Sequence, residues 1–253
     1  MLNAAFPVLT AVDGLFASLM TALPRIFAWG AIAGALAMLV YRLTSNQNAI
    51  ARLKAETRSL RRRMLDPELE QTEFARLVRV NLKASFALLG KTLLPGMLSA
   101  LPVLLIAAWL NAFYGYSMPP NGEPVGLHVE PRGAAVAIEP ADRVAGGSHT
   151  DLTITPPASG ETLTIVAGGV TAYVGNPFAP PVPEIGKQQW WNALLASEAG
   201  YVAPGAGIDR IVFDLPRQQL IGGLPDWLAG WEVPYFFGVL VIAVALKFGL
   251  KIE

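Results

Sequence analysis

Charge is divided along this chain in a way that few folds accommodate. Residues 42–91 carry eleven Lys and Arg against five Asp and Glu, whereas residues 117–231 carry five against eleven, so a net charge of +6 is followed by one of −6. Both blocks are bordered by apolar runs long enough to enter a bilayer. Short basic loops stay on the cytoplasmic side of a membrane. The pattern therefore predicts an integral membrane protein with a basic cytoplasmic loop and an acidic domain on the opposite side.

Three apolar segments are candidates for the membrane-spanning helices. Residues 26–41 are uncharged and would form a helix of about 24 Å, close to the ~30 Å of a hydrocarbon core. Residues 92–116 contain Pro95 and Pro102, which membrane helices tolerate. Residues 233–246 follow a group of aromatic side chains of the kind that marks a membrane interface. A mean hydropathy of +0.44 agrees with this class of protein.

The spans divide the chain into six parts. Residues 1–24 are apolar and either extend the first span or form a separate interfacial helix, broken at Pro24. The other parts are transmembrane helix 1 (25–42), a basic loop (43–91), transmembrane helix 2 (92–116), an acidic domain (117–231), and transmembrane helix 3 with a short tail (232–253). We expect the N-terminus and residues 117–231 outside, and residues 43–91 and the C-terminus in the cytoplasm, in the plasma membrane of a prokaryote.

The basic loop has a helical pattern of its own. Small and apolar side chains recur at steps of three and four residues from Ile50 to Met64 and again from Phe74 to Leu88. Asp66 and Pro67 lie between the two runs, where a helix stops and restarts. We therefore predict a helical hairpin in which each helix continues into a membrane span. The runs are shorter than the three to four heptads that typify a coiled coil.

The acidic part of the chain has the pattern of a small antiparallel β domain, a sandwich or half-barrel. Short stretches rich in β-branched residues alternate with turns rich in Pro and Gly, and residues 186–200 read as a short helix within the domain. The fold class is thus an α-helical membrane protein with three transmembrane helices, a cytoplasmic helical hairpin and an extracytoplasmic β domain. The chain contains no Cys, so the domain folds without disulfides.

Three short runs carry a resemblance to a known family: residues 39–42 at the membrane exit of the first span, residues 52–56, and residues 77–87, which lead into the second span. Through them, residues 25–116 resemble the Oxa1/YidC superfamily of membrane-protein insertases, and above all its three-helix branch. The order and orientation of the elements match as well. This chain departs from the family in the link between the last two spans, which is usually short and here holds residues 117–231.

The resemblance implies a polar groove, open to the cytoplasm and the lipid, that eases the passage of a client's hydrophilic segment. The groove and mouth candidates are polar or cationic residues in or near the spans: Arg25, Arg42, Lys91, Thr92, Ser99 and Asn111. Each has a simpler interpretation. Arg25 suits an interfacial anchor, Arg42 and Lys91 suit topology determinants, and Asn111 suits a hydrogen bond between helices.

Two further groups of residues are candidates for partner contacts. The hairpin carries a basic patch, Arg58, Arg61, Arg62 and Arg63, which suits anionic lipid, ribosomal RNA or a nascent chain, or else a solvated helix face. Trp190 and Trp191 are candidates for an exposed contact on the outer domain, or else for its core. His128 and His149 lack the spacing of a metal site, and no nucleotide-binding or hydrolase motif is present, so we expect no metal, no cofactor and no enzyme activity.

Two functions follow from these observations. The first is an insertase or chaperone-like factor of the Oxa1/YidC type, whose partners are membrane lipids, hydrophobic client proteins and the ribosome, but not DNA. The second is a non-catalytic structural or assembly subunit of a larger membrane complex. The large outer domain and the short third span favour the second function.

Overall fold

The computed structural model describes residues 5–119, 123–131, 134–148, 151–158, 160–190, 192 and 199–250. The chain divides into two compact units. One comprises Met1–Arg25 and Ala107–Val233, and the other comprises Ile26–Ile106 and Pro234–Glu253. The first contains the β domain and the second is helical.

Three helices in the described part of the chain are long and apolar enough to cross a membrane, as the hydropathy predicts. They are α2 (Ala22–Thr44), α4 (Gln71–Tyr114) and α6 (Glu232–Gly249). This finding indicates a membrane protein. Pro95 and Pro102 lie inside α4 without ending it.

The N-terminal segment forms its own helix, α1 (Phe6–Ala17), rather than an extension of the first span. The backbone amides of Leu19 and Met20 both donate to the carbonyl of Phe16, which closes α1, and α2 starts at Ala22. The break thus precedes Pro24. This proline lies in the first turn of α2, where a missing N–H removes no helical hydrogen bond.

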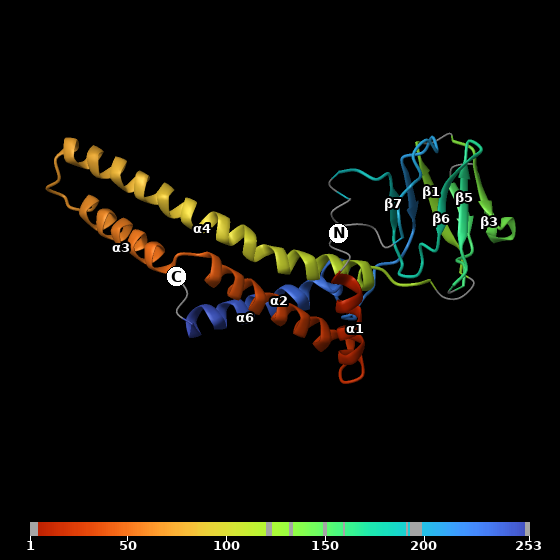
Figure 1. The fold of residues 1–253 in the computed structure, drawn as a ribbon, viewed down its shortest axis with the longest axis horizontal. Helices are drawn as coiled ribbons and strands as arrows, with labels where there is room; N and C mark the ends of the chain where they lie inside the picture. The colour runs from red at the N-terminus through yellow and green to blue at the C-terminus, as the bar shows by residue number, and fades with distance from the viewer. Residues whose placement is uncertain are drawn as a thin grey trace. The chain divides into compact units, whose positions relative to one another are not determined.

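The helical hairpin consists of α3 (Gln47–Met64) and the first part of α4, which run side by side (Figure 1). Leu60 packs with Leu77 and Ala84 in a small buried cluster. At the tip, Arg63 lies 3.7 Å from Glu73. α4 continues from the hairpin into the second span without a break, as expected. α3 is separated from α2, because the Asn46 side chain accepts a hydrogen bond from the Ala49 amide and starts a new helix.

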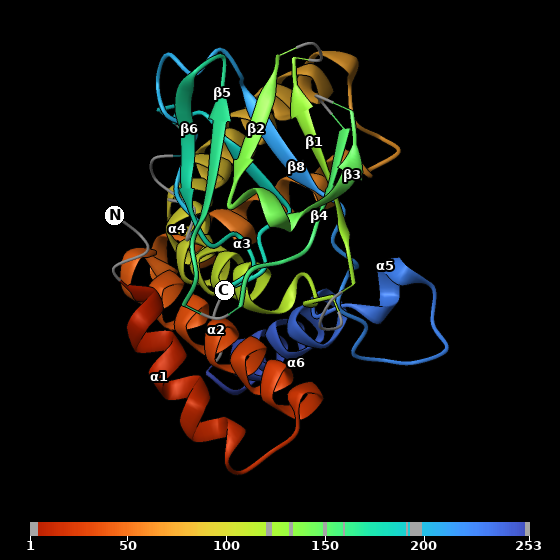
Figure 2. The same cartoon turned by 90° about the vertical axis from the view of Figure 1, so that its right-hand side faces the viewer.

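Eight strands in the described residues form two antiparallel sheets of the β domain (Figure 2). The sheet with order β3-β4-β1-β8-β7 contains β3 (Val144–Gly147), β4 (Asp151–Ile154), β1 (Val125–Glu130), β8 (Arg210–Phe213) and β7 (Glu184–Gly186). The sheet with order β2-β5-β6 contains β2 (Val136–Glu139), β5 (Leu163–Ala167) and β6 (Val170–Gly175). The predicted β domain is therefore present.

Alternating side chains from both sheets fill one core. In β1, Val125, Leu127 and Val129 are buried, as expected when every second residue of a strand faces inward. They pack in one cluster with Ile165 of β5 and Ile211 of β8. The core is thus built by residues of the β domain itself.

The prediction of a short helix over residues 186–200 is wrong for residues 186–190, the first part of this range that the structure describes. Gly186 ends strand β7, and the Lys187 amide donates to the carbonyl of Asp209. Residues 187–190 are not helical, because this backbone is held beside the strand that follows later in the chain. Residues 191 and 193–198 lie outside the described residues.

The two chain segments that connect the β domain to helices pair with each other. The Ser117 amide donates to the carbonyl of Pro216, and the Gln218 amide donates to the carbonyl of Gly115. Tyr116 and Arg217 form an antiparallel bridge between these hydrogen bonds. Beyond it, a short helix, α5 (Asp226–Ala229), precedes α6.

Candidate functional site

A buried polar cluster joins α1, the start of α2 and the end of α4. The Nε of Arg25 lies 3.3 Å from a carboxylate oxygen of Asp13, and both side chains are only 14% exposed. The other carboxylate oxygen accepts a 2.5 Å hydrogen bond from the Tyr114 hydroxyl. The Arg25 guanidinium also lies 5.5 Å from the centre of the Tyr114 ring. One carboxylate therefore neutralises the arginine while the aromatic ring covers it.

A second polar contact joins two of these elements, α1 and α4. The indole N–H of Trp109 donates to the Thr10 hydroxyl at 3.1 Å, and the Trp109 and Tyr114 rings meet edge to face at 6.0 Å. Trp109 is 1% exposed. We call Thr10, Asp13, Arg25, Trp109 and Tyr114 the polar cluster. The hydrogen bonds to Thr10 and Asp13 give the buried polar atoms of Trp109 and Tyr114 their partners.

Sequence reasoning found one member of the polar cluster, Arg25, but not its partners. Asp13 and Arg25 are the only charged residues among the first 41. This isolated pair of opposite charges is the sequence signal that could have indicated their ion pair. Tyr114 lies at the aromatic end of the second apolar segment, a position that by itself indicates only a membrane interface. The structure thus gives Arg25 a defined ion pair.

The remaining groove candidates are either exposed or hydrogen-bonded within their own helix. Arg42, Lys91 and Asn111 have exposed side chains. Thr92 donates its hydroxyl hydrogen bond to the carbonyl of Leu88, four residues earlier in the same helix. Ser99 donates in the same way to the carbonyl of Gly96. The two hydroxyls therefore form their hydrogen bonds within their own helix.

In the helical unit, α2 and α6 meet through small residues. A Cβ atom at Gly30 would collide with the carbonyl oxygen of Tyr235, and one at Gly34 would lie 2.7 Å from the carbonyl oxygen of Val239. A Cβ at Gly238 would collide with the carbonyl oxygen of Phe27. Gly30 and Gly34 are four residues apart, the spacing that lets membrane helices approach closely.

A polar contact ties α6 to α4 in the same unit. The Tyr235 hydroxyl donates to the backbone carbonyl of Val103 at 2.7 Å, and Tyr235 itself is fully buried. Pro102 lies beside this carbonyl in the sequence. In the helical unit, glycine contacts therefore join α6 to α2, and the tyrosine hydrogen bond joins α6 to α4.

The basic patch of the hairpin is accessible. Arg58, Arg61, Arg62 and Arg63 are all exposed, and Arg63 alone has Glu73 nearby at 3.7 Å. Arg58 and Arg62 line a hollow of about 460 Å³ together with Ala55 and Ser59. The hollow is open and carries positive charge, so it suits an anionic group better than an apolar one.

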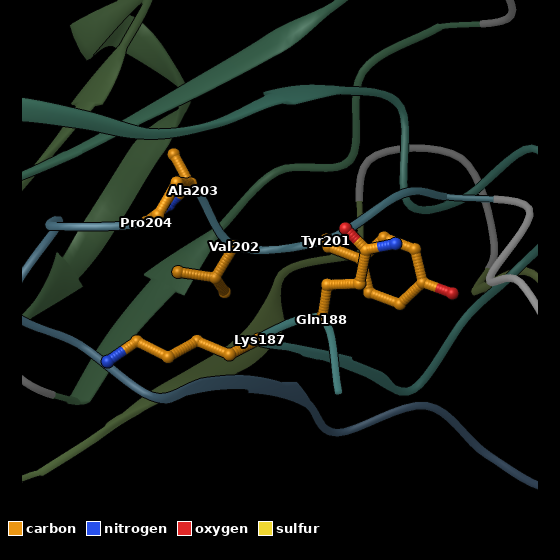
Figure 3. Close-up of a pocket in the computed structure, with 6 residues that line it drawn as sticks. All are labelled: Lys187, Gln188, Tyr201, Val202, Ala203 and Pro204. Atoms are coloured by element: carbon orange, nitrogen blue, oxygen red, sulfur yellow. The ribbon is translucent and has the colours of Figure 1, made fainter. Parts of the chain in front are cut away.

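On the β domain, Trp190 is 84% exposed, whereas Trp191 lies outside the described residues. The same domain has a hollow of about 430 Å³, lined by Lys187, Gln188, Tyr201, Val202, Ala203 and Pro204 (Figure 3). Lys187 forms an ion pair of 2.5 Å with Asp209, which neutralises its charge. Trp190 is thus exposed and does not lie in the core of the domain.

His128 lies between two carboxylates on the surface of the β domain. Its Nδ1 is 2.7 Å from Asp151 of β4, and its Nε2 is 2.9 Å from Asp214, just after β8. The hydrogen bond to Asp151, followed by the one to Asp214, raises the pKa of the imidazole above its usual 6.5. Within the described residues, no group of three or more His, Cys, Asp or Glu is arranged to hold a metal ion. His149 lies outside them.

In comparisons with known proteins, no family model matches this chain, and no curated protein or solved structure shows a significant similarity to it.

Proposed function

We propose that this protein is a non-catalytic structural or assembly subunit of a membrane complex, which anchors an extracytoplasmic β domain through three transmembrane helices. The proposal rests on one observation: the polar groups of the candidate spans form their hydrogen bonds within this chain. The groove candidates Thr92 and Ser99 bond to their own helix, while the glycine contacts and the Tyr235 hydrogen bond close α2, α4 and α6 on one another.

An insertase needs polar groups inside the membrane that stay hydrated and available to a client. Here the charged candidate at the start of α2, Arg25, is neutralised by Asp13 and covered by Tyr114. A scaffold needs instead a rigid set of helices and a domain that partners can bind. The self-contained core of the β domain and its exposed Trp190 agree with that role.

The insertase activity is a second candidate, favoured by a different observation. The exposed arginines at positions 58, 61 and 62 lie on a hairpin that, in the proposed orientation, reaches into the cytoplasm. A basic cytoplasmic surface suits recruitment of a nascent chain or of the ribosome that makes it. The resemblance of residues 25–116 to the Oxa1/YidC superfamily supports the same activity.

Purification of the tagged full chain in nanodiscs, followed by quantitative mass spectrometry, separates the two functions. A structural subunit should retain one or two membrane proteins at fixed stoichiometry. Ribosomes and a varied set of nascent membrane proteins, present in less than stoichiometric amounts, would instead support the insertase. A variant with Arg58, Arg61 and Arg62 changed to Gln is the matched control, because only the insertase should lose its associated material in this variant.

A further inference from the structure

The helix α1 has two different sides. On one side, Phe6 is buried and Thr10 and Asp13 take part in the polar cluster. On the other side, Val8 is 63% exposed and Leu15 is 68% exposed. Ala11, between them, is exposed as well, so three apolar residues at steps of three and four form a continuous uncovered stripe.

The uncovered stripe carries no charge. The single charged residue of α1, Asp13, faces the polar cluster, where its carboxylate pairs with Arg25 and accepts a hydrogen bond from Tyr114. A lipid environment around the stripe would therefore meet only hydrocarbon side chains. An unpaired aspartate on that face would instead oppose its insertion.

The length and course of α1 decide how it can meet the membrane. Its twelve residues extend about 18 Å, well short of the ~30 Å hydrocarbon core. The turn after Ala17 then leads into α2, the first candidate span, and Leu19 in this turn is 79% exposed. The apolar stripe of α1 thus continues along the chain into a segment that enters the membrane.

We propose that α1 is an interfacial helix that binds the lipid surface, with Val8, Ala11, Leu15 and Leu19 inserted among the acyl chains of one leaflet. The polar cluster holds the opposite side of the helix against Arg25 and the end of α4. Since α1 has no basic residue, its insertion rests on buried apolar area and not on anionic headgroups. The depth should therefore be the same in zwitterionic and in anionic bilayers.

The absence of Cys makes this proposal directly testable in the full chain. Leu15→Cys is labelled with an environment-sensitive fluorophore in nanodiscs of phosphatidylcholine, with lipids that carry a nitroxide either near the headgroup or at the chain end. We expect blue-shifted emission and stronger quenching by the shallow nitroxide. The matched control is Leu65→Cys, since Leu65 is 81% exposed at the tip of the hairpin and should show water-like emission without lipid quenching.

Three results would overturn the proposal. Water-like emission at position 15 would place the stripe in solvent. Stronger quenching by the deep nitroxide would place α1 within the bilayer core. Protection from both nitroxides and from a water-soluble quencher would mean that a protein covers the stripe. Leu19→Cys serves as a second labelling site, because it lies outside α1 and a change there leaves the helix intact.

Discussion

The Tyr114 hydroxyl donates a 2.5 Å hydrogen bond to the carboxylate of Asp13, 101 residues away in the sequence. The same carboxylate faces Arg25 through its other oxygen. This contact joins the N-terminal helix to the end of the second candidate span. It also explains how an aspartate and an arginine coexist in an apolar part of the chain.

Asp13→Leu should destabilise the protein strongly, because it leaves the Arg25 guanidinium buried without a counter-ion. Breaking one side of a buried ion pair costs about 3–5 kcal/mol. Tyr114→Phe removes a hydrogen bond to a charged group and should cost about 1.5–3 kcal/mol. Thermal unfolding in nanodiscs measures both effects.

The double variant Asp13→Leu with Arg25→Met is the control for this prediction. It replaces both charges with apolar groups, and such replacements of buried pairs are often neutral. We expect the double variant to recover most of the stability that Asp13→Leu loses. Equal losses in the single and double variants would show that the ion pair is not the source of the effect.

Gly30→Ala, Gly34→Ala and Gly238→Ala should each destabilise the helical unit. Alanine favours a helix over glycine by about 1 kcal/mol, so an isolated helix would gain stability. Here the added methyl group meets the backbone of the opposing helix. Gly90→Ala in α4 is the matched control, because its Cβ would meet nothing within 4 Å. A gain in melting temperature for all four variants would contradict the close approach of α2 and α6.

The coarse features of this fold can be predicted from local patterns, and the polar cluster cannot. Hydropathy indicates the three long apolar helices, and alternation such as Val125, Leu127 and Val129 indicates strands, because each signal lies within a few neighbouring residues. The partners of Arg25 come from positions 13 and 114, and only the folded chain brings them together. The spacing of Gly30 and Gly34 was present in the sequence, but it does not identify the helix they face.

The error at residues 186–190 has a similar cause. Taken alone, residues 186–200 read as a short helix between two glycines. In the fold, the backbone of Lys187 pairs with Asp209, which is 22 positions later in the chain. Tertiary pairing of this kind overrides local propensity.

The stability of the β domain should depend on pH through His128. The folded domain binds the imidazole proton more tightly than the unfolded chain does, since Asp151 and Asp214 raise the pKa above 6.5. The network therefore contributes its full stability below the unfolded-state pKa, and this contribution falls as the pH rises through the higher folded-state pKa. The measurement is the difference in the free energy of unfolding between the wild type and His128→Gln, from about pH 5 to about pH 9.

We expect this difference to be largest at the acidic end and to shrink toward the alkaline end. The variant Asp151→Asn with Asp214→Asn is the control, because it keeps the histidine but removes both carboxylates. We expect the free energy of unfolding of this double variant to differ from that of a triple variant, which also carries His128→Gln, by an amount that varies little with pH. A wild-type difference that stays constant across the range would mean that His128 does not titrate in the way its contacts predict.

Reversal of the basic patch should alter the orientation of the chain in the membrane. Changing Arg58, Arg61, Arg62 and Arg63 to Glu reverses the sign of the net charge of the loop between the first two spans, and Lys and Arg in short loops determine which side stays in the cytoplasm. Labelling of Ser59→Cys with a membrane-impermeant maleimide in intact cells reports on this, since Ser59 is exposed. We expect protection in the otherwise unchanged chain and labelling of part of the population in the reversed variant.

Changing Arg143 and Arg210 of the β domain to Glu is the control, because charges in a long domain contribute little to orientation. Labelling of Ser59→Cys in the unchanged chain would place the hairpin on the outside and reverse the proposed topology.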